Sequence, residues 1–337
     1  MIEPNSRILV INVARIGDTL LVTPVLRALK ESAPGVELTC MAHPNRIDVL
    51  KHLPFVDHLK PITKNTAIWQ GWLPGHHWDH AFVYGHDEAL VSYALRVSRK
   101  VVAFRQRDER LNRKLSVVVP VPAEPMHAVE NRGLLALAED VAITNPRLGY
   151  QVTDEEMNVA KKEIAQLAPE ASPLVVMHVS SFPTKAYRDW PTASFEELGK
   201  RILARYPNAA IVLTGGPDDK DKVAPLQQAL GKRAINLAGR LHLRSTAAIL
   251  SMANLYIGVD TGITHLAGAL DLPMVALYHC FHRGTLLAPL NHSALRVIEH
   301  PCKDGDCTRQ TEMGEIPVGN VWQAATELLD SHGFSPA

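Results

Sequence analysis

One stretch near the end of the chain constrains the fold more than any other. Residues 255–259 form a short apolar run typical of a strand, Asp260-Thr261-Gly262 is a polar turn, and residues 263–270 are small or apolar at helical spacing. A second apolar strand is expected at 274–278. Strand, turn, helix and strand in this order form the repeating unit of a parallel sheet, so the sequence predicts an α/β protein.

The same alternation fills two blocks of the chain. Strands are expected at 7–12, 36–42, 56–61, 81–84 and 101–104, and again at 174–179, 210–214, 234–237, 255–259, 274–278 and 295–299. Strands that alternate with helices of 10–15 residues indicate parallel sheets. We therefore predict two Rossmann-like domains, at 1–155 and 171–317, with a last helix in the segment 318–337.

Two local expectations concern the first domain. Pro24 is best placed at the first position of a helix, so a helix is expected to start there, with residues 18–22 forming a separate turn. Residues 63–78 contain several Gly, Pro and Trp residues, and we expect a loop there.

Composition excludes several classes of protein. The chain has 337 residues, of which 46% are hydrophobic and 21% charged, so it is not a disordered chain. Its formal net charge is zero, which gives no argument for a nucleic-acid partner. The start of the sequence does not read as a signal peptide, and no apolar run reaches about 18 residues.

Cysteine usage suggests a compartment. Cys40, Cys280, Cys302 and Cys307 are too few and too scattered for a disulfide framework, so we expect a reducing cytoplasm. Cys302 and Cys307 are separated by four residues and lie close to His300, which leaves two interpretations, a metal site or an ordinary loop. The loop is favoured because the tight C-x-x-C spacing is absent.

The turn at 260–262 has the chemistry of a phosphate site. A strand that runs into a helix leaves backbone N–H groups without helical partners, and the positive end of the helix dipole attracts anions. Thr261 can add a hydroxyl, and Gly262 allows an anion to approach the backbone closely.

Two further loops follow expected strands of the second block. The first carries Ser180, Ser181, Lys185 and Arg188, whose hydroxyls and cations suit a diphosphate. Its alternative interpretation is a solvated loop before a helix that begins at Pro191. The second carries Gly215 and Gly216, which either hold a nucleoside or only form a turn.

In the first block, Asp18 follows the first strand, where open α/β sheets bind ligands. The alternative is that Asp18 only caps a helix. Cations gather between residues 96 and 114, among them Arg105, Arg107 and Arg110. They form either a solvated face or a surface for an anionic substrate or for membrane headgroups.

Several common site motifs are missing. The chain has no G-x-G dinucleotide turn, no P-loop, no H-E-x-x-H and no G-x-S-x-G, which argues against several common α/β enzymes, nicotinamide oxidoreductases included. D-x-D occurs at 219–221 and 304–306, but this short pattern is common by chance.

Two of these motifs together carry a family resemblance. Arg15-Ile16-Gly17-Asp18-Thr19, combined with Val259-Asp260-Thr261-Gly262-Ile263-Thr264-His265-Leu266-Ala267, resembles the ADP-heptose:lipopolysaccharide heptosyltransferases, the family 9 glycosyltransferases. The similarity extends through residues 23–30 and 236–240 and the strand at Met274.

The resemblance implies a GT-B fold, with two Rossmann-like domains facing a central cleft and a C-terminal helix crossing back toward the first domain. It implies an inverting enzyme in which Asp18 is the catalytic carboxylate. Asp260, Thr261, Gly262 and His265 would form the phosphate-binding turn, and Arg188, with Lys185 as second choice, the phosphate cation.

The resemblance also implies the partners. The second domain would bind an ADP-sugar donor, and the first an anionic inner-core lipopolysaccharide acceptor, with Arg15, Arg105, Arg107 and Arg110 as candidate contacts, at the cytoplasmic face of the inner membrane. No cofactor and no nucleic acid are expected, although stimulation by a divalent metal is left open.

The sequence departs from the family pattern after Tyr278, where it continues His279-Cys280-Phe281-His282-Arg283-Gly284. This departure leaves the donor sugar open. The alternatives are a different sugar-nucleotide enzyme on the same scaffold, an epimerase included, and a non-catalytic relative that binds lipopolysaccharide.

Overall fold

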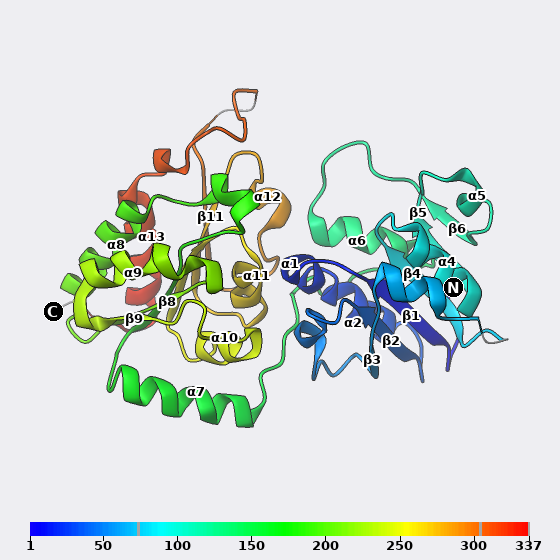
Figure 1. The fold of residues 1–337 in the computed structure, drawn as a ribbon, viewed down its shortest axis with the longest axis horizontal. Coiled ribbons are helices and arrows are strands. Elements are labelled where there is room, and N and C mark those ends of the chain that lie inside the picture. Colours follow the sequence, from blue (N-terminus) through cyan, green and yellow to red (C-terminus); the bar gives the residue numbers. More distant parts are fainter. Residues whose placement is uncertain (73–74, 303–304, 336–337) are drawn as a thin grey trace. The chain divides into compact units, whose positions relative to one another are not determined.

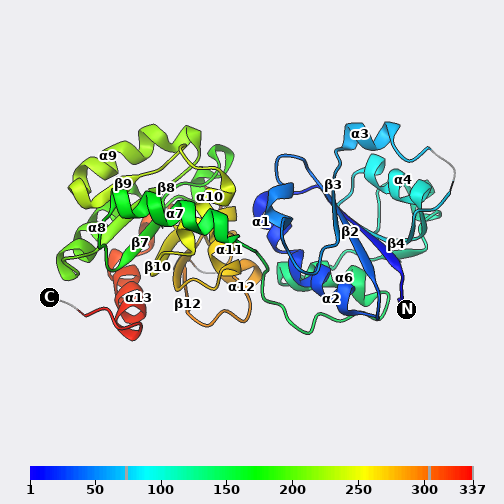
Figure 2. The same cartoon turned by 90° about the horizontal axis from the view of Figure 1, so that it is seen from below.

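The computed structural model describes residues 1–72, 75–302 and 305–335. The chain divides into two compact units, Met1–Gln151 and Val152–Ala337. In each unit, helices cover both faces of a parallel six-stranded sheet (Figures 1 and 2). The predicted α/β class with two Rossmann-like domains is confirmed.

The first unit has the strand order β3-β2-β1-β4-β5-β6, and all pairs are parallel. Its strands are β1 (Arg7–Asn12), β2 (Glu37–Ala42), β3 (His58–Pro61), β4 (Trp78–Tyr84), β5 (Ser98–Phe104) and β6 (Val117–Val119). Its helices are α1 (Ile16–Leu20), α2 (Thr23–Glu31), η1 (Ile47–Leu50), α3 (Lys64–Trp69), α4 (Glu88–Val97), α5 (Glu109–Asn112) and α6 (Ala128–Leu137).

The second unit repeats this topology with the order β12-β11-β10-β7-β8-β9. Its strands are β7 (Leu174–His178), β8 (Ala210–Thr214), β9 (Ala234–Asn236), β10 (Leu255–Val259), β11 (Met274–Tyr278) and β12 (Leu295–Glu299). Its helices are α7 (Asp154–Leu167), η2 (Pro183–Arg188), α8 (Thr192–Arg205), η3 (Pro217–Asp219), α9 (Lys220–Leu230), η4 (Gly231–Arg233), α10 (Leu243–Leu250), α11 (Gly262–Ala269), α12 (Gly284–Leu287), η5 (Met313–Glu315) and α13 (Val318–Ser331).

Strands β7, β8, β10 and β11 are buried on both faces, which explains why they are largely apolar, whereas the edge strand β12 is partly exposed. Side chains alternate between the faces, so Val175, Met177 and Val179 of the β7 segment share one core with α8, α9 and α13. Helices α7, α10 and α11 pack together in a second group. This alternation fixes the register of the strands.

The strand order reverses at one place in each sheet. The reversal lies between β1 and β4 in the first unit and between β7 and β10 in the second. Connections from neighbouring strands lead away in opposite directions there, which opens a crevice at the carboxyl ends of the strands. These two switch points are where the fold favours a ligand.

Some local expectations were wrong. Residues 64–69, expected in a loop, form helix α3, because Thr63 and Thr66 build a capping box at its start. Helix α1 occupies part of the expected turn, and α2 begins at Thr23 with Pro24 in its first turn. The short elements β6 and α5 were not predicted.

The last helix belongs to the second unit. Helix α13 packs against α8, and five of its residues lie in the core of this unit. The expected crossing back toward the first domain stays a prediction. Within the described residues, every helix is too short or too polar to cross a lipid bilayer.

Candidate functional site

The switch point of the second unit brings two of the predicted loops together. Strands β7 and β10 are direct neighbours, with His178 opposite Gly258 in the register. The chain leaves β7 toward Ser180 and leaves β10 toward Asp260 at the same edge of the sheet. Two segments about 80 residues apart in sequence therefore start side by side, because the strand order demands it.

A buried ion pair joins these two segments. Arg188, at the end of η2, donates from Nη1 to Asp260 Oδ2 at 2.6 Å. The side chains are only 15% and 4% exposed. His265 Nε2 lies 3.8 Å from the other oxygen of Asp260. The predicted phosphate cation thus lies at the predicted phosphate turn, but it is held there by a carboxylate that balances its charge.

The turn itself is built by threonine hydroxyls. Thr261 is the N-cap of α11, and its Oγ1 accepts a hydrogen bond from the Ile263 N–H at 3.2 Å. Thr264 donates its hydroxyl to the Val259 carbonyl and hydrogen-bonds the Tyr256 hydroxyl at 2.9 Å. These bonds fix the first turn of α11, whose backbone N–H groups face outward from the helix start. The geometry is that of a helix N-terminal anion site.

The two serines after β7 differ in what their hydroxyls do. Ser181 donates its hydroxyl to the Lys185 carbonyl at 2.7 Å and its backbone N–H to Asp189 at 2.6 Å, so it organises its own loop. Ser180 is 2% exposed, and within the described part of the chain its Oγ has no hydrogen-bond partner. A buried hydroxyl without a partner is costly, which makes Ser180 the stronger candidate to contact a ligand.

Aromatic rings pack over the cations of this loop. Lys185 is partly exposed, and its Nζ lies 5.8 Å from the ring centre of Tyr187. The Tyr187 hydroxyl forms a 2.7 Å hydrogen bond with His282 Nε2. Burial, together with the nearby Arg188, lowers the pKa of His282 to about 4 and keeps this ring neutral near pH 7.

Gly215 and Gly216 follow β8, the other neighbour of β7. The Gly216 N–H is donated to Asp219 Oδ2 at 2.7 Å, and the Gly215 carbonyl accepts from Gly239 at 2.9 Å. These backbone groups form a local turn, and a role for it in holding a nucleoside stays a prediction. The nearby His178 is buried with Nδ1 3.0 Å from the Thr214 hydroxyl, and burial lowers its pKa to about 4.

In the first unit, Asp18 lies in the first turn of α1, close to the switch point after β1. The helix is capped by the backbone of Arg15, so the alternative that Asp18 is the cap is wrong. Asp18 Oδ1 instead accepts from Arg132 Nη2 of α6 at 2.7 Å, and the carboxylate stays 47% exposed. Sequence reasoning missed Arg132, which lies 114 residues from Asp18.

Arg132 is itself held in place. Its Nη1 donates to the Ala128 carbonyl at 2.9 Å, and its own carbonyl accepts from the Tyr84 hydroxyl at 2.9 Å. Tyr84 ends β4, the strand across the switch point from β1. The Asp18 carboxylate is therefore oriented by a guanidinium that is anchored on the same unit.

The candidate acceptor arginines have different surroundings. Arg105 pairs with Glu109 at 2.7 Å and Arg110 with Asp108 at 3.0 Å, where the chain passes from the end of β5 into α5. Arg15 and Arg107 are exposed. Exposed pairs of this kind are easily replaced by contacts with a ligand because they contribute little stability, about 0–1 kcal/mol each.

The cysteines depart from expectation. Cys280 and Cys307 form a single disulfide with a Cα–Cα distance of 5.9 Å, which the sequence analysis did not predict. The pairing is invisible in the sequence because 27 residues separate the two cysteines. Of the D-x-D patterns, Asp219 serves the turn described above, and Asp304 lies outside the described residues.

Comparison with known proteins points to one family. The sequence model of glycosyltransferase family 9 (heptosyltransferase) matches residues 88–316. Lipopolysaccharide heptosyltransferase 3 of Escherichia coli is 24% identical, with 94% of this chain and 97% of that protein covered. Lipopolysaccharide heptosyltransferase 1 of Pseudomonas aeruginosa is 26% identical, with coverages of 81% and 78%.

Solved structures show the same fold. The family 9 glycosyltransferase of Veillonella parvula superposes with a TM-score of 0.85 at 18% identity, over 98% of this chain and 99% of that one. ADP-heptose lipopolysaccharide heptosyltransferase II of E. coli gives a TM-score of 0.78 at 22% identity, over 97% and 99%.

Proposed function

Because the chain belongs to glycosyltransferase family 9, the heptosyltransferase family, we propose that it transfers a heptose from ADP-heptose to an inner-core lipopolysaccharide sugar. The observation that carries the proposal is the switch point of the second unit. It combines the N-terminus of α11, the Arg188 guanidinium and the buried Ser180 hydroxyl at one edge of one sheet.

The donor site follows from these three groups. Backbone N–H groups of the first turn of α11 receive the diphosphate, and the helix dipole adds to the attraction. Arg188 supplies a positive charge beside them, and Ser180 supplies a hydroxyl donor. Gly215 and Gly216 stay candidates to contact the nucleoside of the donor. Their turn would pack against it rather than hydrogen-bond to it.

Asp18 acts as the general base in this proposal. It accepts the proton of the acceptor hydroxyl as the hydroxyl oxygen bonds to the anomeric carbon and the bond to the ADP oxygen breaks. Attack opposite the leaving group inverts the anomeric carbon. A positioned carboxylate contributes typically about 10²–10⁴-fold to such a step. The ion pair with Arg132 fixes the orientation of the Asp18 carboxylate, while nearly half of the Asp18 side chain stays exposed and accessible to an acceptor.

The leaving ADP gathers negative charge as its bond to the sugar breaks. Fixed N–H dipoles and a guanidinium stabilise that charge without reorganisation, and in this proposal they make a metal unnecessary. Asp260 holds the Arg188 side chain in position before a ligand binds, so the guanidinium need not reorient when the donor arrives. A divalent ion that merely stimulates the reaction is compatible with this arrangement.

A lipid-linked acceptor calls for contact with a membrane surface, and α3 of the first unit offers one. Ile68, Trp69 and Trp72 are 51%, 82% and 70% exposed. The exposed Lys64 begins α3, and the Arg96 guanidinium lies 4.6 Å from the centre of the Trp72 ring. Exposed tryptophans beside cations are typical of the interface with anionic lipid. We place the enzyme at the cytoplasmic face of the inner membrane as part of the proposal.

The membrane contact is tested with vesicles of anionic phospholipid. Replacing Trp69 and Trp72 by Ser should reduce sedimentation of the protein with the vesicles at least about tenfold, since each buried aromatic contributes about 2 kcal/mol. Val159→Ser, an exposed apolar residue on α7, is the matched control and should sediment like the wild type. Equal sedimentation of all three proteins would remove this part of the proposal.

The donor is tested with a panel of ADP-, UDP- and GDP-sugars. Binding stabilises the fold by mass action, so the preferred nucleotide should raise the melting temperature most. We expect ADP-heptose to do so and to yield a glycosylated inner-core acceptor. Preference for another nucleotide indicates a different sugar-nucleotide enzyme, and binding without product indicates a non-catalytic relative.

A further inference from the structure

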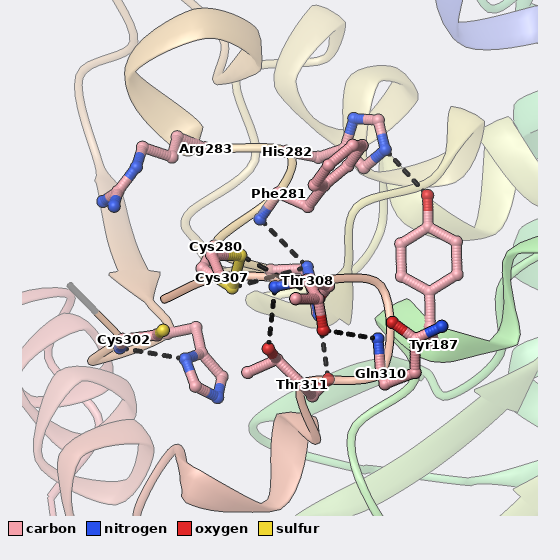
Figure 3. The surroundings of a disulfide bond; sticks show 12 residues. Tyr187, Cys280, Phe281, His282, Arg283, Cys302, Cys307, Thr308, Gln310 and Thr311 are labelled. Atoms are coloured by element: carbon pink, nitrogen blue, oxygen red, sulfur yellow. Dashed lines mark hydrogen bonds between the residues drawn. A yellow bond between two sulfur atoms is a disulfide. The ribbon is translucent and has the colours of Figure 1, made fainter. Parts of the chain in front are cut away.

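We propose that the reduced protein binds one soft divalent metal ion, with Zn²⁺ as the expected ion, at a cluster of three cysteines and two histidines. The thiol–imidazole cluster, as we name it, consists of His279 and Cys280 after β11, His300 and Cys302 after β12, and Cys307. Figure 3 labels its three cysteines. The proposed transfer reaction uses none of these side chains.

The ligand atoms form two overlapping groups of three that share the Cys280 sulfur. One ligand atom from each of His279, Cys280 and Cys307 lies within 4.8 Å of the others, and the same holds for Cys280, His300 and Cys302. Cys280 belongs to both groups and so centres the cluster. Two sulfurs at about 2.3 Å from a tetrahedral Zn²⁺ lie roughly 3.8 Å apart. Once the Cys280–Cys307 bond is reduced, its two sulfurs must move apart to this separation before both can bind one ion.

The two histidines are oriented in the same way. His279 Nε2 lies 2.9 Å from the Thr311 carbonyl, and His300 Nε2 lies 3.0 Å from the Glu312 carbonyl. A carbonyl only accepts hydrogen bonds, so both Nε2 atoms carry the proton and both Nδ1 atoms have a lone pair. Metal-binding histidines usually donate their second nitrogen in this manner.

Each Nδ1 lone pair now accepts a backbone N–H two residues further on. Phe281 donates to His279 at 3.0 Å, and Cys302 donates to His300 at 3.0 Å. A metal would replace one of these bonds, and the other histidine would stay a supporting group. Burial favours the site, because His279, Cys280 and His300 are at most 5% exposed. Cys302 and Cys307 are half-buried, so the ion could enter from their side. Mixed Cys and His ligands are typical of structural zinc.

Metal binding and the disulfide exclude each other. A disulfide sulfur is not a thiolate and cannot ligate, so Cys280 and Cys307 contribute only after their bond is reduced. Reduction by a phosphine in water adds two electrons to the S–S bond and yields two thiols. One water molecule supplies both thiol protons and the oxygen of the phosphine oxide. Each thiol then gives up its proton on binding the metal.

The cluster also lies beside the proposed donor loop. The Tyr187 ring packs edge-on against His279 at 5.2 Å between ring centres, and Figure 3 shows its hydroxyl directed at His282 of the segment after β11. Tyr187 directly precedes Arg188. A metal bound at the thiol–imidazole cluster would therefore fix the segment that supports this loop.

The experiment measures metal binding by the full chain after complete reduction with a phosphine under anaerobic conditions. Co²⁺ serves as a spectroscopic probe, followed by displacement with Zn²⁺ and metal analysis. We expect one ion per chain, thiolate-to-cobalt charge-transfer absorption, and protection of three thiols from alkylation by Zn²⁺. The oxidised chain, with Cys280–Cys307 intact, should bind at least about tenfold more weakly.

Cys302→Ser is the decisive variant because it leaves both disulfide cysteines unchanged. Its Zn²⁺ affinity should fall at least about tenfold, because even the loss of an outer-shell partner typically costs that much. Cys40→Ser, which replaces a buried thiol in β2, should bind like the wild type. Circular dichroism checks that both variants fold. Absence of metal from the reduced wild type, or equal affinity of the Cys302→Ser variant, would overturn the proposal. Metal binding is read out without donor or acceptor, so its failure would leave the proposed transferase function untouched.

Discussion

Arg188 and Asp260 form a buried ion pair at 2.6 Å although 72 residues separate them in the chain. The pair exists because β7 and β10 are neighbours at the point where the strand order of the second sheet reverses. It places a guanidinium at the N-terminal end of α11, where helix geometry already favours an anion. The proposed donor site therefore depends on the topology of the sheet as much as on any single residue.

Removal of the Asp260 charge should destabilise the second unit. In Asp260→Asn, Arg188 loses its partner while it stays largely buried, and such a loss costs about 3–5 kcal/mol. Urea unfolding measures this change in the free energy of unfolding. Glu197→Gln breaks the exposed Glu197–Arg201 pair on α8 and should cost less than about 1 kcal/mol. An equal loss of unfolding free energy in both variants would show that the buried pair stabilises the fold no more than the exposed pair does.

Ser180→Ala should weaken ADP binding without weakening the fold. The Ser180 hydroxyl has no hydrogen-bond partner among the described residues, so its loss should change the free energy of unfolding by less than about 1 kcal/mol. A hydrogen bond to a charged phosphate contributes about 1.5–3 kcal/mol, which predicts a 10- to 100-fold loss of affinity in calorimetry. Ser181→Ala is the matched control and should instead lose stability, because Ser181 bonds the Lys185 carbonyl. Unchanged ADP affinity of Ser180→Ala would exclude this hydroxyl from the site.

Arg132→Gln should lower kcat at least about tenfold, because the Asp18 carboxylate loses the group that aims it. ADP affinity should stay as in the wild type, since Arg132 belongs to the first unit and the proposed donor groups to the second. Arg132→Lys retains a cation and should restore part of the rate. Arg201→Gln, on an exposed face of α8, is the control. A normal kcat in Arg132→Gln would show that Asp18 needs no positioning.

Acid should destabilise the second unit through His178. Burial lowers the pKa of this ring to about 4, whereas the unfolded chain titrates near 6.5. Between these values the unfolded state binds more protons, so stability is lost as pH falls from 6.5 toward 4. The contribution amounts to about 2 kcal/mol between pH 7 and pH 5.

Unfolding by urea at these two pH values measures the effect. In His178→Asn the pH dependence should shrink by that amount, because the other titrating groups are common to both proteins and cancel in the difference. The same pH dependence in the variant and the wild type would mean that His178 is not the group responsible.

The sequence analysis correctly predicted those strands that depend only on the local pattern of residues. Residues 255–259 and 274–278 are strands as predicted, because buried parallel strands are continuously apolar and are bounded by turns. Helix α3 was missed because Gly, Pro and Trp residues around it suggested a loop, while its Thr63–Thr66 capping box was overlooked.

The sequence analysis did not predict the contacts between residues that lie far apart in the chain. Nothing near Asp18 indicates Arg132, and nothing in the spacing of four cysteines selects Cys280 with Cys307. The ionic partner of Arg188 was equally hidden, since Asp260 was expected to bind phosphate rather than a cation. Such contacts depend on which strands lie side by side, and a pattern of single residues does not encode that directly.

The central claim is that Asp18 is the base of a transferase whose donor binds elsewhere in the chain. The most direct test is the transfer rate of Asp18→Asn with ADP-heptose and an inner-core acceptor, measured together with the affinity for the ADP-sugar. We predict a rate at least about 10²-fold lower than that of the wild type, with an affinity within about twofold. A variant that keeps near wild-type turnover would contradict the account.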